Sequence, residues 1–193
     1  MPNLTTFPTL KDMEELKHNT PMYMCPSNVP YAAIGEGWLS DKECNDILFE
    51  YMDKPTYKFP HCNALTRECS RPLNRVLDPM VEFVRRMNNS FWNYDLTSTA
   101  AYLQTYTPGR NYQKHMDVVP GQMRKLSAVL MLSDPSDYEG GRLQFWYWPD
   151  PFDVPYARGT IVVFNSWLVH EVRPVSKGIR QTINMGFWGP NFR

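Results

Sequence analysis

The stretch Val169-His170-Glu171-Val172-Arg173-Pro174, which continues to Arg180-Gln181-Thr182, decides how the rest of the chain is interpreted. His170 in this stretch has to be considered together with an earlier stretch, His115-Met116-Asp117. Residues i and i+2 of a strand point to the same face, so a strand that ends at His115 and Asp117 presents an imidazole and a carboxylate on one side. With His170 the set becomes two histidines and one carboxylate, which is the facial ligand set of mononuclear non-haem Fe(II) sites.

Arg180 lies ten residues after His170, and Thr182 falls on the same face of the same expected strand. A guanidinium fork beside a hydroxyl suits a carboxylate that is held through two parallel hydrogen bonds. Each pattern alone is common in proteins, but together they predict an Fe(II) enzyme that uses the dicarboxylate 2-oxoglutarate. The remaining histidines, His18 and His61, have no comparable surroundings.

Length and composition favour one domain, since 193 residues are enough to bury a sizeable core. Lysine plus arginine and aspartate plus glutamate both number 20, so no net charge draws the chain to nucleic acid or to an anionic membrane. No apolar run approaches the roughly 20 residues that span a bilayer. Residues 1–16 also lack the basic and apolar segments of a secretory signal. We therefore expect no nucleic-acid partner and no membrane partner.

The four cysteines, Cys25, Cys44, Cys62 and Cys69, include no Cys-x-x-Cys pair. They predict neither a disulfide framework nor a zinc site. Buried or idle thiols are the better interpretation, and a cytoplasmic location is expected.

Two helices are expected before the strands begin. Ser40 and Glu43 have the spacing of a capping box, and the apolar stripe after them predicts a helix that ends near Lys54. A second helix is predicted with Asp78 as N-cap and Pro79 at the first helical position, where proline costs no hydrogen bond. The two stripes are Cys44, Ile47, Leu48 and Tyr51, and Met80, Phe83, Val84, Met87 and Phe91.

Short strand patterns separated by Gly and Pro turns fill the rest of the chain. They predict a mainly β fold with some α structure, a distorted double-stranded β-helix (jelly roll) with N-terminal supporting helices. Residues 60–71 are polar and receive no assignment. Residues 1–30 are expected to be a variable lead-in, and residues 31–193 the domain. Strands are expected at 31–34, 97–106, 112–117, 126–132, 142–148, 160–164, 170–172 and 179–188.

Three longer stretches carry a family resemblance: YTPGRNYQKHMD (106–117), LSAVLMLSDPSDYEGG (126–141) and HEVRPVSKGIR (170–180). They resemble the Fe(II)/2-oxoglutarate oxygenases of the prolyl 4-hydroxylase type, most closely the bacterial and phage branch of PKHD-type hydroxylases. The similarity runs from about Tyr31 to the end of the chain, and residues 1–30 lie outside it.

The resemblance implies that His115, Asp117 and His170 hold Fe(II) and that Arg180 holds the distal carboxylate of 2-oxoglutarate. It also implies that O2 is consumed and 2-oxoglutarate is decarboxylated to succinate while a substrate C–H bond is hydroxylated, with ascorbate as a candidate reductant. Related halogenases have a small residue in place of the carboxylate ligand, so Asp117 favours hydroxylation.

The sequence does not decide the roles of several residues near the site. Thr182 is a candidate to support the contact between Arg180 and the carboxylate. Tyr106 or Tyr102 is a candidate to donate a hydrogen bond from its phenol hydroxyl to the cosubstrate. At least one of these tyrosines is expected to serve core packing instead. Ser127, Val129 and Met131 should share one strand face, and whether that face meets the cosubstrate is undecided.

The aromatic run from Phe145 to Trp148 suggests a substrate contact. Side chains alternate along a strand, so one pair of these aromatic residues must face away from the core. Trp146 and Trp148 are candidates for a flat apolar wall beside the metal, suited to a proline ring or an extended peptide. The alternative is that the run closes the end of the jelly roll, in which case the substrate should be sought near residues 56–71.

Two competing functions, a nucleic-acid base oxygenase and a cupin-like binding protein, fit these residues less well. Oxygenases that act on nucleic-acid bases carry a second arginine six residues after the cosubstrate arginine, where this chain has Gly186. A cupin-like binding protein without catalysis does not need Arg180 and Thr182 at this interval. Among hydroxylases, the substrate is a peptidyl proline, another amino-acid side chain, or a free amino acid or small metabolite; the sequence decides neither this nor the oligomeric state.

Overall fold

The computed structural model describes residues 22–24, 30–59, 62–69, 75–118, 123–148 and 150–191. His18, His61 and Cys25 therefore lie outside the described residues. The elements in chain order are β1 Met22–Met24, β2 Pro30–Gly35, α2 Asp41–Tyr51, β3 Thr56–Phe59, β4 Cys62–Glu68, the 3₁₀ turn η1 Arg75–Leu77, α3 Asp78–Met87, the π-helical turn η2 Asn88–Trp92, β5 Ser98–Tyr106, β6 Tyr112–His115, β7 Arg124–Met131, the 3₁₀ turn η3 Pro135–Asp137, β8 Tyr138–Gly140, β9 Leu143–Trp148, β10 Asp150–Asp153, β11 Ile161–Asn165, β12 Val169–Val172, β13 Val175–Gly178 and β14 Arg180–Trp188.

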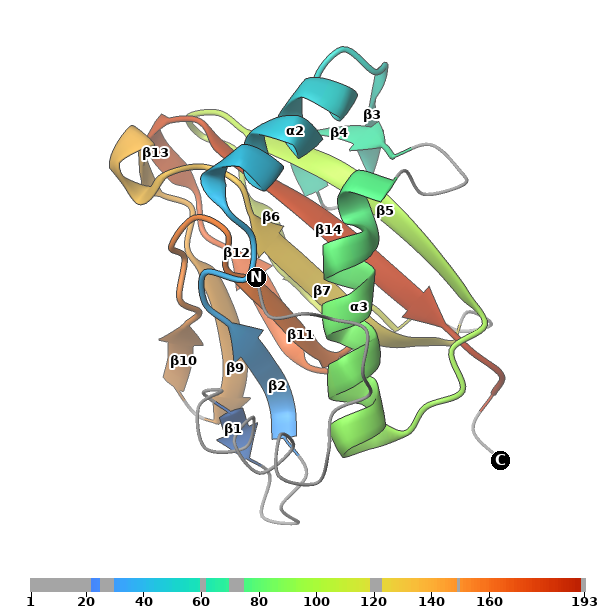
Figure 1. The fold of residues 1–193 in the computed structure, drawn as a ribbon. Coiled ribbons are helices and arrows are strands. Elements are labelled where there is room, and N and C mark those ends of the chain that lie inside the picture. The colour runs from blue at the N-terminus through green and yellow to red at the C-terminus, as the bar shows by residue number, and fades with distance from the viewer. Residues whose placement is uncertain are drawn as a thin grey trace.

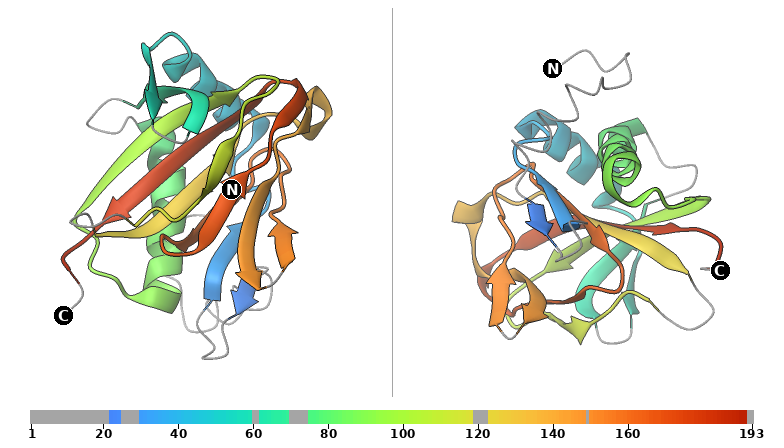
Figure 2. Two further views of the ribbon diagram at one scale, coloured as in Figure 1. Left: turned by 180° about the vertical axis from the view of Figure 1, so that it is seen from behind. Right: turned by 90° about the horizontal axis from the view of Figure 1, so that it is seen from below.

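One curled antiparallel sheet organises the described part of the chain (Figures 1 and 2). Its strands run in the order β1-β2-β11-β7-β14-β5-β4-β6-β12-β9-β10, with β3 paired to β4. Side chains from β2, β5, β7 and β11 meet those of β9 and β12 in one buried apolar cluster, so the two halves of the sheet face each other. This is the predicted jelly roll.

The helices α2 and α3 cover the outside of the half that contains β14, β7 and β11 (Figure 1). Side chains of β14 alternate between two buried regions, one packed against the helices and one inside the curl. Its Ile183, Met185 and Phe187 are buried with the helices, whereas Arg180 and Thr182 point to the opposite face, toward the interior of the curl. The same strand therefore anchors the helices and lines the interior.

The first helix forms as its sequence predicts. The Ser40 hydroxyl accepts from the Glu43 amide at 3.3 Å, and the Glu43 carboxylate accepts from the Ser40 amide at 2.8 Å. The apolar stripe buries Cys44, Ile47 and Tyr51 against the sheet. The helix ends at Tyr51, three residues before the predicted Lys54.

The second helix starts one residue away from the prediction. Asp78 is the first helical residue and Leu77 is the N-cap, because the preceding turn η1 already leads into the helix. Of the predicted stripe, Met80, Phe83, Val84 and Met87 are buried and Phe91 is partly buried in the π-helical turn η2. The predictions of this helix and of its buried face are therefore confirmed except for the cap.

The hairpin of β3 and β4 was not predicted, because polar residues hide its alternation. In β4 the side chains of Cys62, Ala64 and Thr66 are buried and those between them are not. Strand β3 has no buried side chain and pairs with β4 alone. A strand that buries nothing leaves no hydrophobic pattern in the sequence.

Two smaller findings follow from the described residues. Cys44, Cys62 and Cys69 are buried free thiols, which agrees with the absence of a predicted disulfide framework. Among the described residues, no helix is long and apolar enough to cross a membrane.

Candidate metal and cosubstrate site

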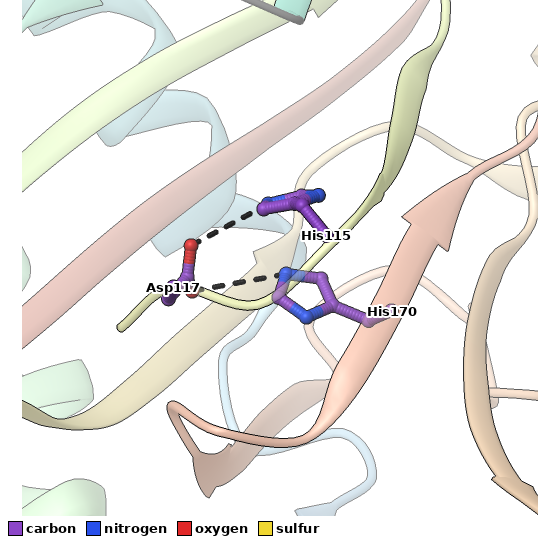
Figure 3. Close-up of side chains that lie close together, drawn as sticks. All are labelled: His115, Asp117 and His170. Atoms are coloured by element: carbon purple, nitrogen blue, oxygen red, sulfur yellow. Dashed lines mark ion pairs between the residues drawn. The ribbon is translucent and has the colours of Figure 1, made fainter. Parts of the chain in front are cut away.

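Three polar side chains converge inside the curl (Figure 3). His115 on β6 lies directly across from His170 on β12, and the centroids of their rings are 4.3 Å apart. The ligand atoms of His115, Asp117 and His170 all lie within 4.8 Å of one another. The structure therefore brings together the three residues that the sequence singled out.

Asp117 reaches this point in a different way from the one expected. Strand β6 ends at His115, so the alternation of a strand does not place Asp117. Instead, the Asp117 amide donates to the Ser166 carbonyl at 2.8 Å. The Ser127 hydroxyl donates to Asp117 Oδ2 at 2.6 Å and lies 2.9 Å from the Ser166 hydroxyl. Contacts with β7 and with the turn after β11 replace the expected strand geometry.

Both histidines are oriented by their own strands. His115 Nδ1 lies 2.6 Å from the Gln113 carbonyl oxygen, and His170 Nδ1 lies 2.9 Å from that of Leu168. A carbonyl oxygen only accepts, so each Nδ1 carries the proton and each Nε2 keeps a free lone pair. This is the tautomer that a metal-binding histidine needs when its second nitrogen is held by a carbonyl group.

The free Nε2 atoms have no better partner among the described residues. They lie 3.5 Å and 3.7 Å from the oxygens of Asp117, beyond a good hydrogen bond. His115 Nε2 is buried and has no hydrogen-bond partner. Two unprotonated nitrogens and a carboxylate directed at one point fit a divalent metal ion.

The electrostatics of the site favour the protonation states that bind metal. Burial lowers the pKa of His170 to about 4, although Asp117 opposes this effect, so the imidazole is neutral at neutral pH. Burial alone would raise the pKa of Asp117. The Arg124 guanidinium, His170 and the hydrogen bond from the Ser127 hydroxyl outweigh the effect of burial and hold the pKa of Asp117 below its usual value. Asp117 is therefore ionised.

Among the residues that the structure describes, Arg180 is the largest fully buried side chain, with 2 % of its surface exposed. Its Nη2 contacts Met131 Sδ at 3.6 Å, whereas Nε and Nη1 have no hydrogen-bond partner. None of the ion pairs within the described ranges involves it. A buried charge without a partner is costly, so this guanidinium fits an anionic ligand.

One pocket of about 230 Å³ joins Arg180 to the three converging side chains. Ser127 and Val129 line it, which answers the open question about their strand face. Its other lining residues are Phe59, Tyr102, Gln104, Tyr112, Arg124, Leu143, Phe164, Val172, Asn184 and Trp188.

Comparison with known proteins agrees with this geometry. Residues 101–188, which include all three converging side chains and Arg180, match the 2OG-Fe(II) oxygenase superfamily. The chain is therefore similar to this superfamily over that segment. The chain is 34% identical over 113 residues to a PKHD-type hydroxylase of Sphingopyxis alaskensis, a match that covers 54% of this chain and 50% of that protein. It is 36% identical over 119 residues to one of Klebsiella pneumoniae, with 57% and 53% covered. The chain thus spans about half the length of the curated relatives it matches.

Solved structures of 2OG oxygenases share the fold. A prolyl-4-hydroxylase of Pseudomonas putida superposes with a TM-score of 0.71 at 20% identity, covering 83% of this chain and 94% of that one. A prolyl hydroxylase of Trichoplax adhaerens, solved with a peptide fragment of hypoxia inducible factor, gives a TM-score of 0.70 at 15% identity, with 93% and 91% covered. These likenesses confirm the jelly-roll architecture.

The other residues predicted to contact the cosubstrate, Tyr102, Tyr106 and Thr182, lie in different places. Tyr102 lines the pocket. Tyr106 is fully buried with its ring 5.2 Å from the Arg180 guanidinium, and its hydroxyl donates to Gln104 at 2.6 Å. The Thr182 hydroxyl donates to Asn184 Oδ1 at 2.9 Å. Tyr102 is therefore the one of these three side chains that lies at the pocket surface.

The aromatic run of β9 does not place Trp146 in the pocket. Phe145 pairs with His170 and is fully buried, so the next residue, Trp146, points to the outer face of the sheet. There its indole donates to Glu171 at 3.0 Å, and Lys114 Nζ lies 3.0 Å from the ring centroid. The Trp148 side chain lies outside the described part of the structure.

Sequence reasoning did not single out Tyr112, Arg124, Asn184 or Trp188. The Tyr112 ring stacks on His115 at 3.9 Å between centroids, and burial raises the pKa of its phenol. Its position three residues before His115 was the available signal. Arg124 Nη1 lies 3.2 Å from Asp117 Oδ1, and no local sequence pattern marks this contact.

The argument from Gly186 against a nucleic-acid substrate is weaker in the structure than in the sequence. A Cβ atom on Gly186 would lie 2.7 Å from Arg124 Nε and 2.5 Å from the Trp188 ring. The space is therefore occupied by a guanidinium from another strand. What remains against a nucleic-acid partner is the balanced net charge.

Proposed function

We propose that the chain is an Fe(II)- and 2-oxoglutarate-dependent hydroxylase that acts on a peptidyl proline or another amino-acid side chain. The observation that carries this proposal is the position of Arg180. A fully buried guanidinium with two unpartnered nitrogens shares one pocket with an ionised aspartate and two histidines whose Nδ1 atoms are held by backbone carbonyl groups. A dicarboxylate that chelates a metal at one end fits both features at once.

The roles follow from the contacts. His115, Asp117 and His170 hold Fe(II), and Arg180 binds the distal carboxylate of 2-oxoglutarate as a bidentate fork. Tyr102 lies where it can donate to the cosubstrate. Tyr106 and Thr182 act one contact further out, since their hydroxyls already donate to Gln104 and Asn184. When bound, Fe(II) supplies the oxidation by which O2 and 2-oxoglutarate yield succinate, CO2 and a hydroxylated carbon.

The protein itself orients the reactants and excludes water. The apolar side chains Val129, Leu143, Phe164 and Val172 line the pocket around the polar groups. All four of these residues are buried, so they form an apolar lining around the polar groups. A dry pocket strengthens the contact between Arg180 and a carboxylate.

The aromatic lining supports an amino-acid substrate. Phe59, Tyr102, Tyr112 and Trp188 all line the pocket, and flat rings bind a proline ring or an extended peptide at low entropic cost. The names of the relatives point the same way, since two structural neighbours are prolyl hydroxylases and one was solved with a peptide. A free amino acid or small metabolite is the alternative substrate.

The test combines cosubstrate turnover with product identification. Protein incubated with Fe(II), 2-oxoglutarate, O2 and ascorbate should form succinate, and mass spectrometry should find a gain of one oxygen in proline-containing peptides. Oxygen gain only in free amino acids would select the metabolite alternative. Absence of succinate formation with iron bound would refute the proposed activity.

A further inference from the structure

Gln104 is a buried polar side chain that lines the pocket. It lies on β5 between Tyr102 and Tyr106, and only 4 % of its surface is exposed. A carboxamide in such a place is expected to have hydrogen-bond partners for its oxygen and for its nitrogen. Those partners show which of the two atoms is available to a ligand in the pocket.

The Tyr106 hydroxyl determines how the carboxamide of Gln104 is oriented. It lies 2.6 Å from Gln104 Oε1, which is a typical length for an O–H···O bond and shorter than the roughly 2.7 to 3.2 Å of an N–H···O bond. The hydroxyl therefore donates to the carboxamide oxygen. Because Tyr106 is itself fully buried, this contact holds Oε1 and leaves Nε2 as the atom that a ligand can meet.

The nitrogen of Gln104 has a donor that is not used. Within the described part of the chain its one hydrogen-bond contact is Cys62 Sγ, 3.7 Å away, and sulfur is a weak acceptor. A carboxamide nitrogen carries two hydrogens, so one of them has no partner among those residues. Because Gln104 lines the pocket, a ligand bound there can accept from this hydrogen.

The strand register places Gln104 beside Arg180. Arg180 on β14 pairs with Tyr106 on β5, and Gln104 lies two residues before Tyr106 on the same face. Gln104 is therefore a diagonal neighbour of Arg180. The Tyr106 ring lies beside both groups, since the guanidinium is 5.2 Å from its centroid and Gln104 accepts from its hydroxyl. Nε and Nη1 of Arg180 also have no hydrogen-bond partner, so two neighbouring residues present unused donors at the same end of the pocket.

We propose, on the basis of the proposed function, that Gln104 is a cosubstrate-binding residue that donates to the distal carboxylate of 2-oxoglutarate. Arg180 approaches this carboxylate from β14 and Gln104 approaches it from β5. A carboxylate only accepts, and its two oxygens have lone pairs for both residues. Tyr106 is the positioning residue, because its hydroxyl keeps the nitrogen of Gln104, rather than the oxygen, on the side of the carboxylate. Gln104 thereby selects a cosubstrate that ends in a carboxylate.

The experiment compares two ligands that differ only at the distal end, since 2-oxopentanoate has a methyl group where 2-oxoglutarate has its distal carboxylate. Calorimetric titration of the full chain, loaded with Fe(II) in the absence of O2, measures the affinity for each. Gln104→Met should weaken 2-oxoglutarate binding about tenfold or more, as for a lost hydrogen bond to a charged group, and leave 2-oxopentanoate binding unchanged. Gln144→Met is the matched control and should equal wild type for both ligands, because Gln144 lies outside the pocket and donates to Asp153.

Tyr106→Phe tests the positioning role. Without the hydroxyl the carboxamide can turn, so 2-oxoglutarate should bind more weakly than in wild type. The double variant with Gln104→Met should lose no more affinity than Gln104→Met alone, because both changes act on one contact. The inference would be overturned by an unchanged 2-oxoglutarate affinity in Gln104→Met, by equal losses for the two ligands, or by additive losses in the double variant. If wild type bound 2-oxoglutarate no more tightly than 2-oxopentanoate, the proposed function itself would fail.

Discussion

His115 and His170 face each other across the β6–β12 pair, and Nδ1 of each ring is held by the backbone carbonyl oxygen two residues earlier in the chain. The two strands therefore fix both tautomers without help from any other side chain. Both Nε2 atoms point toward Asp117 (Figure 3). The metal site is thus largely preorganised by backbone geometry.

Replacing either histidine should remove the metal. We expect His115→Ala and His170→Ala to lose Fe(II) binding in anaerobic titrations and to form no succinate, because only one imidazole and one carboxylate remain. His18→Ala, a histidine outside this set, should bind iron and turn over 2-oxoglutarate like wild type. Turnover by either alanine variant at the wild-type rate would remove the triad from the mechanism.

Arg180→Lys should separate cosubstrate binding from metal binding. The ammonium keeps the charge but loses the two parallel hydrogen bonds, so the KM for 2-oxoglutarate should rise about tenfold or more, as expected for a lost charged hydrogen bond. Iron affinity should stay at the wild-type level. An unchanged KM would show that another group holds the distal carboxylate.

Arg180→Met should stabilise the protein in the absence of ligands. A buried guanidinium without a partner costs desolvation that an apolar chain of similar length avoids, so the free energy of unfolding should rise by about 1 kcal/mol or more. Urea denaturation measures this change. The same variant should lose the thermal stabilisation that metal and 2-oxoglutarate together give to wild type. A destabilised variant would mean that Arg180 has a structural partner.

The metal-free protein should lose stability between pH 6.5 and pH 4. The pKa of His170 is about 4 in the folded protein and 6.5 in an unfolded chain, so below pH 6.5 the unfolded state binds a proton that the folded state does not. The free energy of unfolding should fall by about 3 kcal/mol at most across this window, and no further below it. Urea denaturation at a series of pH values measures the slope. His170→Asn should flatten it, and an equal slope in that variant would assign the effect to other groups.

Replacing Phe59 or Trp146 tests which face of the sheet binds the substrate. Phe59 on β3 lines the pocket and is 37 % exposed, so Phe59→Ala should fold normally and lower kcat/KM for the hydroxylated substrate. Its KM for 2-oxoglutarate should not change. Trp146→Ala, on the outer face of the sheet, should leave both parameters near wild type. The opposite result would move the substrate to the outer face of β9.

The sequence predicted those features that repeat with a period or sit in a motif. The capping box at Ser40 and the buried stripe of α3 are local, and the order of the histidines, Asp117 and Arg180 was carried by residue type and by the family resemblance. The fold class followed from the same strand patterns. These features depend on few long-range contacts, so they can be recognised in the amino-acid sequence alone.

What the sequence did not show depends on contacts between distant strands. Asp117 is placed by Ser166 and Ser127 rather than by the strand that precedes it. Arg124 enters the pocket because of one extra residue on β7. Trp146 was assigned to the pocket because alternation gives two faces but not which one is inside. In each case the deciding partner is far away in the sequence.

Strand β14 presents the helix core on one face and the pocket on the other, and this restricts how the protein can change. Substitutions on either face act on one function at a time, either on packing against α3 or on the ligands. A one-residue insertion or deletion within β14 would exchange the two faces and place Arg180 or its neighbours among the helices. A substitution in β14 therefore affects one face, whereas a change of its length affects the helix packing and the pocket together.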